Sequence, residues 1–411
     1  MKLRIGIDDT DSKKGMCTTY LGAVLRDRLR SFAKVLELRL VRLNPNIPWK
    51  TRGNGAVALT VETGDYDRAV SETLEVVEDL AALDVEGTNP GVVIAKGDVP
   101  SELTSFYYNA LHGVVTIEDA AALAEKHGCE LHMFKEGRGI IGGLAAIGAD
   151  LTDHTYEVIA YRTPEYWGRP RHVDPSSVYE MDRATRPATY NNVDPETGRI
   201  LVTPRSPCPV LYGIRGTDRE VLIRAMKMIR AGEPVERWAL YKTNQGTDAH
   251  LKPCAIEEIE PYSSVIIRGV VSEAPRVIEG GHVIFSIAEG GCSVDCAAYE
   301  PTGGFREVVK RLCPGDVVRA YGGVTKENKT VNLEKLEVLD VKELFKLKNP
   351  VCPKCGKTMK SAGKGQGFRC RGCGTKAEAK EPVQIERDLK PGLYCVPERA
   401  MRHLSRPVVR I

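Results

Sequence analysis

The chain has 411 residues and a formal net charge of +3, with 42% hydrophobic and 27% charged residues. This is the composition of a soluble globular protein, and the length exceeds the roughly 250–300 residues at which a single core stops growing. No apolar run reaches the roughly 18 residues of a membrane-spanning helix, and the charged N-terminus is unlike a signal peptide. We therefore expect a cytoplasmic protein of several domains that does not act at a membrane.

The first hundred residues alternate between the apolar patterns of strands and of helices. Strands are predicted at 2–8, 34–43, 55–63 and 91–97, and helices at 18–32 and 65–83. This βαββαβ order is that of a ferredoxin-like α+β sandwich. Residues 1–150 are predicted to form the first domain.

A cluster of aspartates, Asp8, Asp9 and Asp11, follows the first predicted strand. Asp side chains often stabilise turns, which explains one or two of them. Three carboxylates this close repel one another unless a cation lies between them, and Mg²⁺ prefers carboxylate and phosphate oxygens. The cluster therefore predicts a Mg²⁺ site for phosphoryl transfer. Thr18 and Thr19 begin the next helix, either as N-caps or as hydroxyls beside a phosphate.

Two glycine-containing stretches complete the expected ATP site. KTRGNGA at 50–56 combines cations with a flexible loop, and GRGIIGGLAAIGAD at 137–150 is long and rich in small residues. Glycine lets backbone N–H groups approach phosphate closely, although neither stretch is a Walker A or Rossmann motif. The residues predicted to bind ATP are Lys50, Arg52, Gly53, Asn54, Gly55, Gly139, Gly142 and Gly143.

Residues 151–260 predict a second α+β domain, with strands at 155–162, 199–204, 210–216 and 237–246 and a helix at 219–232. WGRPRH at 167–172 mixes cations with a ring, as RNA contacts do, but a loop packed on an arginine stem is the commoner explanation. TNQGTD at 243–248 is either a solvent loop or a site lining. Isolated histidines without ligand spacing are predicted to be structural: His112, His127, His132 and His282.

Residues 261–345 show short strand patterns broken by glycines, with one helix-like stretch between them. This pattern predicts an OB-like barrel, a fold that binds nucleic acids. Cys292 and Cys296 lie on this segment, and we expect them to pack in the barrel rather than to bind a metal.

Four of the twelve cysteines form two Cys-x-x-Cys pairs, CPKC and CRGC: Cys352, Cys355, Cys370 and Cys373. Two such pairs hold four thiolates around one structural Zn²⁺, which predicts a zinc ribbon over 346–382. A redox or disulfide role is the alternative. The other eight cysteines are scattered, unlike the framework of a small secreted domain.

The C-terminal part is strongly basic, with 17 Lys or Arg against 6 Asp or Glu from Val341 to Ile411. Cations meet phosphates and rings stack on bases, so this surface suits RNA or DNA; a solvated tail is the alternative. The tail, 383–411, either extends the grip on RNA or folds back on the ribbon. The residues predicted to bind RNA are Lys354, Lys357, Lys360, Phe368, Arg369 and Arg371.

Several motifs follow one another in a fixed order: GIDDTDS with GMCTTYLG, TRGNGA, GGLAAIGA, YNNVDPETGRILVTPRSPCPVLYGIRG and LYKTNQGTDAH, then the barrel and the ribbon. In this order the chain resembles, over nearly its whole length, the archaeal isoleucine-tRNA 2-agmatinylcytidine synthetases, the TiaS family. The resemblance implies an ATP- and Mg²⁺-binding kinase-like domain at 1–150 and a second ferredoxin-like domain at 151–260. It implies that the OB-fold and zinc-ribbon modules hold the tRNA.

The resemblance also implies a reaction. Agmatine replaces the C2 oxygen of the wobble cytidine of isoleucine tRNA with a CAU anticodon, through a phosphorylated cytidine, and ATP is consumed to AMP and phosphate. The family's catalytic aspartates map onto Asp8, Asp9 and Asp11, and its autophosphorylated threonine maps onto Thr18. No protein partner is predicted.

Other possibilities stay open from the sequence alone. Agmatine is cationic at both ends, so its pocket needs a carboxylate or an aromatic wall, and the sequence does not identify it. Candidates chosen by charge alone are Asp174, Asp194, Asp218 and Asp248. A single-strand-binding protein without catalysis, or an ATP-dependent enzyme acting on a small molecule or another RNA base, also fits parts of the pattern.

Overall fold

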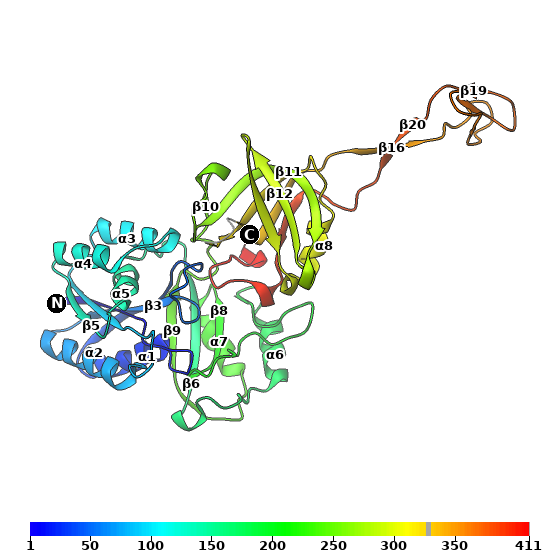
Figure 1. Cartoon of the computed structure of the whole chain (residues 1–411). Helices are drawn as coiled ribbons and strands as arrows, with labels where there is room; N and C mark the ends of the chain where they lie inside the picture. Colours follow the sequence, from blue (N-terminus) through cyan, green and yellow to red (C-terminus); the bar gives the residue numbers. More distant parts are fainter. Residues whose placement is uncertain (326–329, 411) are drawn as a thin grey trace.

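The computed structural model describes residues 1–325 and 330–410, so the predicted barrel and tail each include positions outside it, 326–329 and 411. Figure 1 shows a body built on one large sheet, a barrel beside the body, and a small module at the end of a long stalk. The predicted multidomain α+β organisation, with a barrel and a C-terminal ribbon, is confirmed. Within the described residues, no helix has the length and apolar character needed to cross a membrane.

A nine-stranded sheet forms the body, in the order β5-β4-β1-β3-β2-β9-β6-β8-β7. The predicted βαββαβ run is present in it. Its elements are β1 (Lys2–Asp8), α1 (Thr18–Leu29), β2 (Lys34–Arg42), β3 (Gly55–Glu62), α2 (Tyr66–Leu80) and β4 (Gly91–Lys96). Because β1 pairs with both β3 and β4, the aspartates that follow it leave from the interior of the sheet and not from an edge.

Helices cover both faces of this part of the sheet. Leu3, Ile5 and Ile7 of β1 are fully buried in the core that α1 and α2 share. Beside the edge strand β5 (Glu130–Met133), the opposite face is covered by α3 (Ser101–His112), α4 (Ile117–Lys126) and α5 (Gly139–Gly148). Alternation along the strand places Gly6 on the α5 face, where a Cβ would lie 2.0 Å from the carbonyl oxygen of Gly143. The glycine-rich stretch is therefore a helix packed directly on strand backbone.

The sheet continues into the segment that was predicted as a separate domain, because β2 pairs in parallel with β9 at Arg39↔Lys242 and Leu40↔Thr243. Further elements of this half are β6 (Thr155–Arg162), α6 (Pro175–Thr185), β7 (Thr189–Tyr190), β8 (Val210–Gly216), α7 (Arg219–Met228) and β9 (Val235–Thr243). The strand predicted at 199–204 is not formed; Ile200 makes one isolated bridge with Val193. The two halves of the body thus share one sheet.

The TNQGTD segment lies at the junction of the two halves. Thr243, Asn244 and Gln245 are at most 1% exposed. Asn244 Oδ1 accepts the backbone N–H of Arg42 at 2.8 Å, and its Nδ2 donates to the hydroxyl of Tyr107 at 2.9 Å. The solvent-loop alternative is therefore wrong, since these amides fasten β9 to β2 and α3.

The barrel closes on itself, because β11 pairs with β12 and β14, and β15 pairs with β13 and β14. Its strands are β11 (Ser264–Val277), β12 (Val283–Glu289), β13 (Cys292–Ala298), β14 (Val317–Val324) and β15 (Val331–Asp340), preceded by the short β10 (Lys252–Pro253) and joined by helix α8 (Gly304–Lys310). Cys296 is fully buried in the barrel core, and Cys292 packs partly against that core, as predicted.

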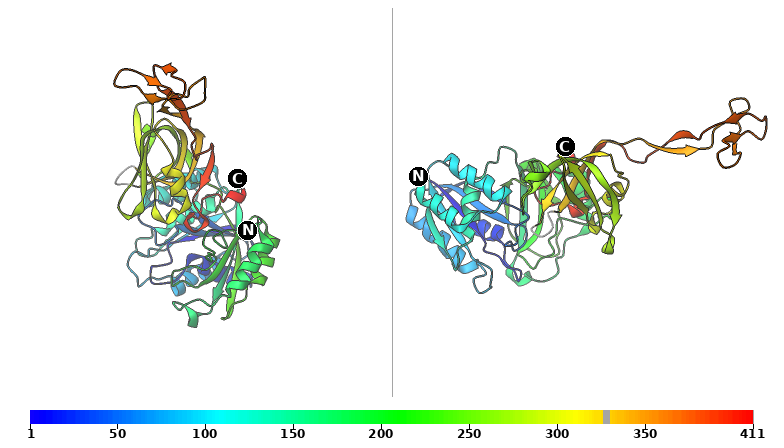
Figure 2. Two further views of the ribbon diagram at one scale, coloured as in Figure 1. Left: turned by 90° about the vertical axis from the view of Figure 1, so that its right-hand side faces the viewer. Right: turned by 45° about the horizontal axis from the view of Figure 1, so that its top comes forward.

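A two-stranded stalk, β16 (Leu344–Lys348) paired with β20 (Glu381–Ile385), carries the ribbon away from the rest of the molecule (Figure 2). The ribbon holds the short strands β17 (Lys360–Ser361), β18 (Phe368–Arg369) and β19 (Lys376–Ala377). After the stalk, β21 (Gly392–Cys395) pairs with β15 of the barrel. Residues 396–410, the C-terminal segment, then run back to the body. Of the two alternatives for the tail, folding back on the ribbon is therefore wrong, and extension of the grip on RNA stays a prediction.

Candidate active site

A cavity of about 460 Å³ opens where the two halves of the body meet the C-terminal segment. Its walls come from the loop after β1, the loop before β3, the strands β6 and β8, and residues 398–403. This volume lies within the range of pockets that hold nucleotide-sized ligands. The predicted site residues that line it are Asp8, Asp9, Asp11, Thr18, Lys50, Arg52, Gly53, Asn54, Gly55 and Gly142.

The carboxyls of Asp8 and Asp9 lie close together, and each accepts a hydrogen bond from a backbone N–H. Asp8 Oδ1 accepts the N–H of Asp9 at 2.7 Å, and Asp9 Oδ2 accepts the N–H of Asn89 at 3.1 Å. Burial, with the added repulsion of Asp9, raises the pKa of Asp8 to about 8, and burial with the charge of Asp11 raises the pKa of Asp9 to about 7. Oxygen ligands in this state fit a hard divalent cation, which would hold both groups ionised.

The third aspartate has a different partner. Asp11 Oδ2 accepts from Arg52 Nε at 2.9 Å and also from Arg52 Nη2. Across residues 1–325 and 330–410, the sulfur ligands of the ribbon are the one group of three or more metal-type ligands that converges within 4.8 Å. The three carboxylates therefore do not converge as a ready-made triad, and Asp8 and Asp9 are the pair that fits a cation.

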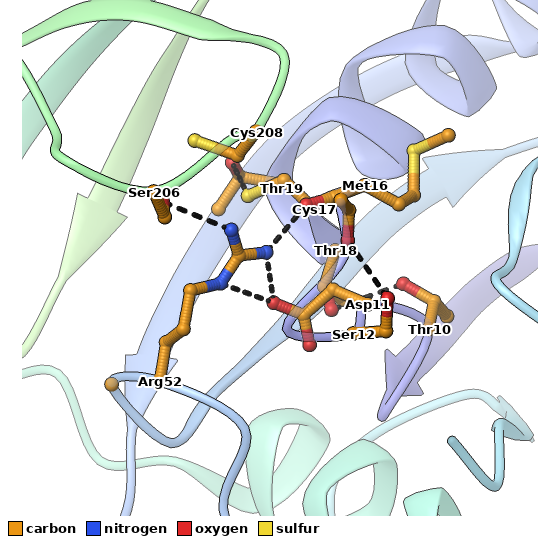
Figure 3. A network of polar contacts seen from close by, with 12 residues as sticks. Thr10, Asp11, Ser12, Met16, Cys17, Thr18, Thr19, Arg52, Ser206 and Cys208 are labelled. Atoms are coloured by element: carbon orange, nitrogen blue, oxygen red, sulfur yellow. Dashed lines mark hydrogen bonds and ion pairs between the residues drawn. The ribbon is translucent and has the colours of Figure 1, made fainter. Parts of the chain in front are cut away.

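Arg52, predicted to bind phosphate, connects the two halves of the body. Its guanidinium donates to Asp11, to the carbonyl of Met16, and to Ser206 Oγ at 3.1 Å, as Figure 3 shows. Ser206 belongs to the loop before β8. The aspartate loop and the loop of the second half are thus fixed to each other by one side chain.

Thr18 is the first residue of α1, and Cys17 is the N-cap. The alternative that Thr18 or Thr19 caps the helix is therefore wrong. Thr18 is 5% exposed, and its Oγ1 accepts the hydroxyl of Thr10 at 3.0 Å (Figure 3). This hydrogen bond leaves the proton of the Thr18 hydroxyl free to be donated toward the cavity that the residue lines.

The predicted glycines divide into two groups. Gly142 lies against the aspartates, because a Cβ there would stand 1.9 Å from Asp8 Oδ2. Gly139 and Gly143 do not line the cavity; a Cβ on Gly139 would stand 2.4 Å from the carbonyl oxygen of Asp8, and one on Gly143 would stand 2.9 Å from that of Gly6. These two glycines permit close packing of α5 on β1, and the Gly139 N–H is already bonded to the carbonyl of Asn89.

Arg42, Glu157, Arg215 and His403 also line the cavity, and the sequence analysis missed these four residues. Gln245 of the TNQGTD segment does not line the cavity; it is fully buried and joins Arg42 to Glu157. Gln245 Nε2 donates to Glu157 Oε2 at 2.6 Å, and Arg42 Nε donates to Gln245 Oε1 at 3.3 Å. Arg215 Nε lies 3.4 Å from Glu157 Oε1, and Arg215 Nη2 donates to His403 Nδ1 at 2.6 Å. A carboxylate within the strand pattern at 155–162 was the available signal for Glu157, whereas nothing local marks His403.

The four aspartates proposed for agmatine by charge alone have structural partners, and none of them lines the cavity. Asp174 and Asp218 cap α6 and α7. Asp194 pairs with Arg399 at 2.8 Å, and Asp248 accepts the N–H of Arg406 at 2.6 Å. Glu157 is the lining carboxylate that stands apart from the aspartate loop and on the sheet.

The WGRPRH segment is structural. Arg171 donates to the carbonyls of Pro204, Ser206, Cys208 and Val210, so the loop before β8 is packed around its guanidinium, as the commoner explanation predicted. Trp167 lies edge-on to Tyr20, with ring centroids 5.3 Å apart. The four histidines predicted as structural each make a hydrogen bond to another protein group, and none of them lines the cavity.

The ribbon brings its four cysteine sulfurs together. Cys352 Sγ lies 3.3 Å from Cys373 Sγ, and Cys355 Sγ lies 3.3 Å from Cys370 Sγ, so the four thiols form the donor set of a structural zinc site. The predicted basic residues of the ribbon are exposed. Phe368 is half-buried and packs against the ribbon's small core, so it contributes to the ribbon's fold.

Three domain models match the chain: the TiaS TCKD domain over residues 4–70, the TiaS FLD domain over 137–250 and the TiaS C-terminal zinc ribbon domain over 349–389. The isoleucine-tRNA 2-agmatinylcytidine synthetase TiaS of Archaeoglobus fulgidus is 46% identical over 414 residues, covering 100% of this chain and 98% of the relative. That of Methanosarcina mazei is 46% identical over 417 residues, covering 99% of this chain and 97% of the relative.

Solved structures agree with the sequence comparison. A crystal structure of TiaS in complex with its isoleucine tRNA and ATP matches with a TM-score of 0.91 and 46% identity, covering 100% of this chain and 98% of that one. A complex of TiaS with the same tRNA, AMPCPP and agmatine matches with a TM-score of 0.89 and 44% identity over the same shares. Identity of this degree over the whole length places the chain in the TiaS family.

Proposed function

We propose that the protein is an ATP-dependent ligase that conjugates agmatine to C2 of the wobble cytidine of isoleucine tRNA with a CAU anticodon. The observation that carries the proposal is one cavity lined both by the half-buried pair Asp8 and Asp9 and by Arg42, Glu157 and Arg215, which hydrogen bonds connect through Gln245. A reaction that activates an oxygen with phosphate and then displaces it with an amine needs both parts. The whole-length identity to agmatinylcytidine synthetases supports the same assignment.

The chemistry accounts for the two parts. A cytosine carbonyl oxygen is a poor leaving group, and transfer of a phosphoryl group onto it makes it a good one. The amine of agmatine then forms the new C–N bond, and the C–O bond breaks with release of phosphate. Asp8 and Asp9 would hold Mg²⁺, which neutralises phosphate charge when bound. Thr18, which lines the same cavity as this pair, is the proposed acceptor of a phosphoryl group on the protein itself.

Glu157 is the proposed anionic wall for agmatine. It is 5% exposed, and it shares its oxygens with Gln245 and Arg215 at the cavity surface. A carboxylate fixed in this way can accept from the guanidinium or amine of a cationic ligand without moving. The acidic residues first considered for this role do not line the cavity.

We further propose the domain plan of kinase-like 1–150, ferredoxin-like 151–260, OB-fold 261–345, zinc ribbon 346–382 and tail 383–411. The order β4-β1-β3-β2 in the first half and the closed path β11-β12-β13-β15-β14 support the ferredoxin-like and OB assignments. The exposed lysines and arginines of the ribbon support a role in holding tRNA, at a distance from the cavity that the stalk sets (Figure 2). We place the activity in the cytoplasm, together with its tRNA.

The other two classes account for less of the molecule. A single-strand-binding protein without catalysis leaves the cavity and its half-buried aspartates without a role. An ATP-dependent enzyme acting on a small molecule leaves the ribbon, at the end of a long stalk, without a role. An enzyme acting on another RNA base does not explain the whole-length identity to agmatinylcytidine synthetases.

The test is direct. The full-length protein is incubated with ATP, Mg²⁺, agmatine and an isoleucine tRNA transcript with a CAU anticodon, and the wobble nucleoside is weighed by mass spectrometry. We expect cytidine to gain the mass of agmatine less one water, and a transcript with uridine at the wobble position to stay unchanged. An unmodified cytidine in folded, ATP-binding protein would overturn the proposal.

A further inference from the structure

The C-terminal segment, residues 396–410, reaches the cavity from the far end of the chain. None of the matching domain models extends past residue 389. Yet Glu398, Arg399, Met401 and His403 all line the cavity. The segment therefore contributes one wall of the site, although it follows the ribbon in the sequence and lies on the body in space (Figure 1).

The segment is fastened on both sides of the cavity. On the second half, Arg186 pairs with Glu398 through two hydrogen bonds of 2.8 and 2.9 Å, and Arg399 pairs with Asp194. Toward the first half, Leu404 is 2% exposed within the core that α3 and α5 share. A segment held by buried and bidentate contacts is a fixed part of the fold and not a mobile tail.

His403 is the residue that this segment presents to the polar network. Its backbone carbonyl accepts the N–H of Gly246 at 2.9 Å, which fixes its position along the segment. Its Nδ1 accepts from Arg215 Nη2 at 2.6 Å, and its ring lies against Gly53, where a Cβ would stand 3.1 Å from Nε2. The side chain is thus confined between the loop that carries Gly53 and the guanidinium of Arg215.

The charges around the imidazole favour its neutral form. The positive charge of Arg42, then burial, then the charge of Arg215 lower the pKa of His403 well below its usual range. The carboxylate of Glu157 faces Arg215 from the opposite side, 3.4 Å from Nε. A neutral imidazole can accept from a guanidinium, whereas a protonated one would repel it.

We propose that the C-terminal segment completes the active site, and that His403 is the positioning residue that holds Arg215, and through it Glu157, in place. Arg215 then has two fixed acceptors, Nδ1 of His403 and Oε1 of Glu157, and its orientation is set before any ligand enters. When polar groups are already held in position, less conformational entropy is lost on substrate binding. The inference rests on the proposed function where it identifies agmatine as the ligand of this wall.

The experiment compares full-length His403→Ala, His403→Asn and His403→Gln. Asn places an acceptor near Nδ1, and Gln places one near Nε2. We expect His403→Ala to raise the KM for agmatine about tenfold or more while the KM for ATP stays unchanged, and Asn, but not Gln, to restore most of the loss. His127→Ala, at the C-cap of α4 and outside the cavity, is the matched control and should behave as wild type.

Two readouts separate the outcomes. In the wild type, the ¹⁵N resonance of His403 Nδ1 should be that of an unprotonated acceptor from pH 6 to 8 and should shift in Arg215→Lys, whatever the substrate is. If wild type forms agmatidine and His403→Ala has unchanged KM values, the inference is overturned while the proposed function stands. If wild type forms no agmatidine, the proposed function fails, and a ¹⁵N signal of a protonated Nδ1 would overturn the positioning role separately.

Discussion

At the scale of single residues, Asp8 is the carboxyl whose ionised form a bound cation would stabilise most. It lies at the end of β1 with a neighbour of the same charge, and burial raises its pKa to about 8. Asp8→Asn keeps the shape and removes the charge, so we expect ATP consumption to fall by about 100-fold or more while tRNA affinity stays unchanged. The measurements are AMP release and a tRNA gel-shift titration.

The control for this variant is Asp98→Asn, a change of the same type in a side chain that is 97% exposed on the surface. It should match wild type in both assays. If Asp8→Asn instead lost tRNA binding together with thermal stability, the aspartate cluster would have a folding role and the phosphoryl-transfer site would have to be sought elsewhere.

The site residues that sequence could predict are those whose meaning is local. Asp8, Asp9 and the four ribbon cysteines stand close together in the chain, so their spacing carries the signal. Arg42, Glu157, Arg215 and His403 come from four distant segments, and none has a neighbour in sequence that marks it. The pairing of β6 with β8, which sets Glu157 opposite Arg215, the pairing of β2 with β9 and the return of the C-terminal segment bring these four side chains together.

At the scale of elements, the packing of α5 on β1 explains a strand and a helix rich in glycine. A Cβ on Gly6 would lie 2.0 Å from the carbonyl oxygen of Gly143, a backbone atom that cannot rotate away. Gly6→Ala should therefore lower the free energy of unfolding by about 1–3 kcal/mol, measured by chemical denaturation. Gly64→Ala, where a Cβ meets nothing within 4 Å, should be close to neutral. Equal effects of the two variants would contradict this account of the α5 contact.

Elements with a clear period were predictable, and those decided by tertiary contact were not. The βαββαβ run of residues 2–96 was found from its apolar pattern alone, with small differences at its ends. Each glycine disfavours a helix by about 1 kcal/mol relative to alanine, so the sequence of residues 139–148 does not predict a helix. The packing of this segment on β1 stabilises the helix instead. Conversely, residues 199–204 have the pattern of a strand, but among them only Ile200 forms a β-bridge, an isolated one with Val193, so no strand forms.

At the scale of the whole molecule, the stalk separates the ribbon's stability from that of the body. The ribbon has a core of only a few residues around its cysteines, so its fold depends on the metal those thiols hold. Cys370→Ser, or treatment with a zinc chelator, should lower tRNA affinity at least tenfold while ATP binding and the melting of the body stay unchanged. Calorimetry and tRNA titration check this. A chelator that lowered ATP binding as well would indicate that the metal also supports the cavity.

The barrel, the body and the C-terminal segment meet at one buried carboxylate, and this junction makes a pH-dependent prediction. Glu334 of β15 is 4% exposed; it lies 3.1 Å from His250 Nε2 and 3.5 Å from Arg402 Nε, and it also accepts from Ser405. Burial alone would raise its pKa, but His250, Arg402 and Ser405 outweigh burial and bring the pKa down to about 2. The ionised carboxylate is therefore the form that the folded junction stabilises.

The sign of the effect follows from this shift. A carboxyl whose pKa is lower in the folded state adds stability above its ordinary value near 4.5, and that stability is lost as pH falls toward 2. Glu334→Gln should lower the free energy of unfolding at pH 7 by about 1–3 kcal/mol, and the difference in this free energy from wild type should shrink between pH 4.5 and 2.

Glu337→Gln, on the same strand but paired with Arg319 and Tyr321 within the barrel, is the control and should show a smaller effect at pH 7. A gap for Glu334→Gln that did not change with pH would mean that the carboxylate's shape, and not its charge, joins the C-terminal segment to the barrel. The attachment of the C-terminal segment, and with it one wall of the cavity, would then be as stable at low pH as at pH 7.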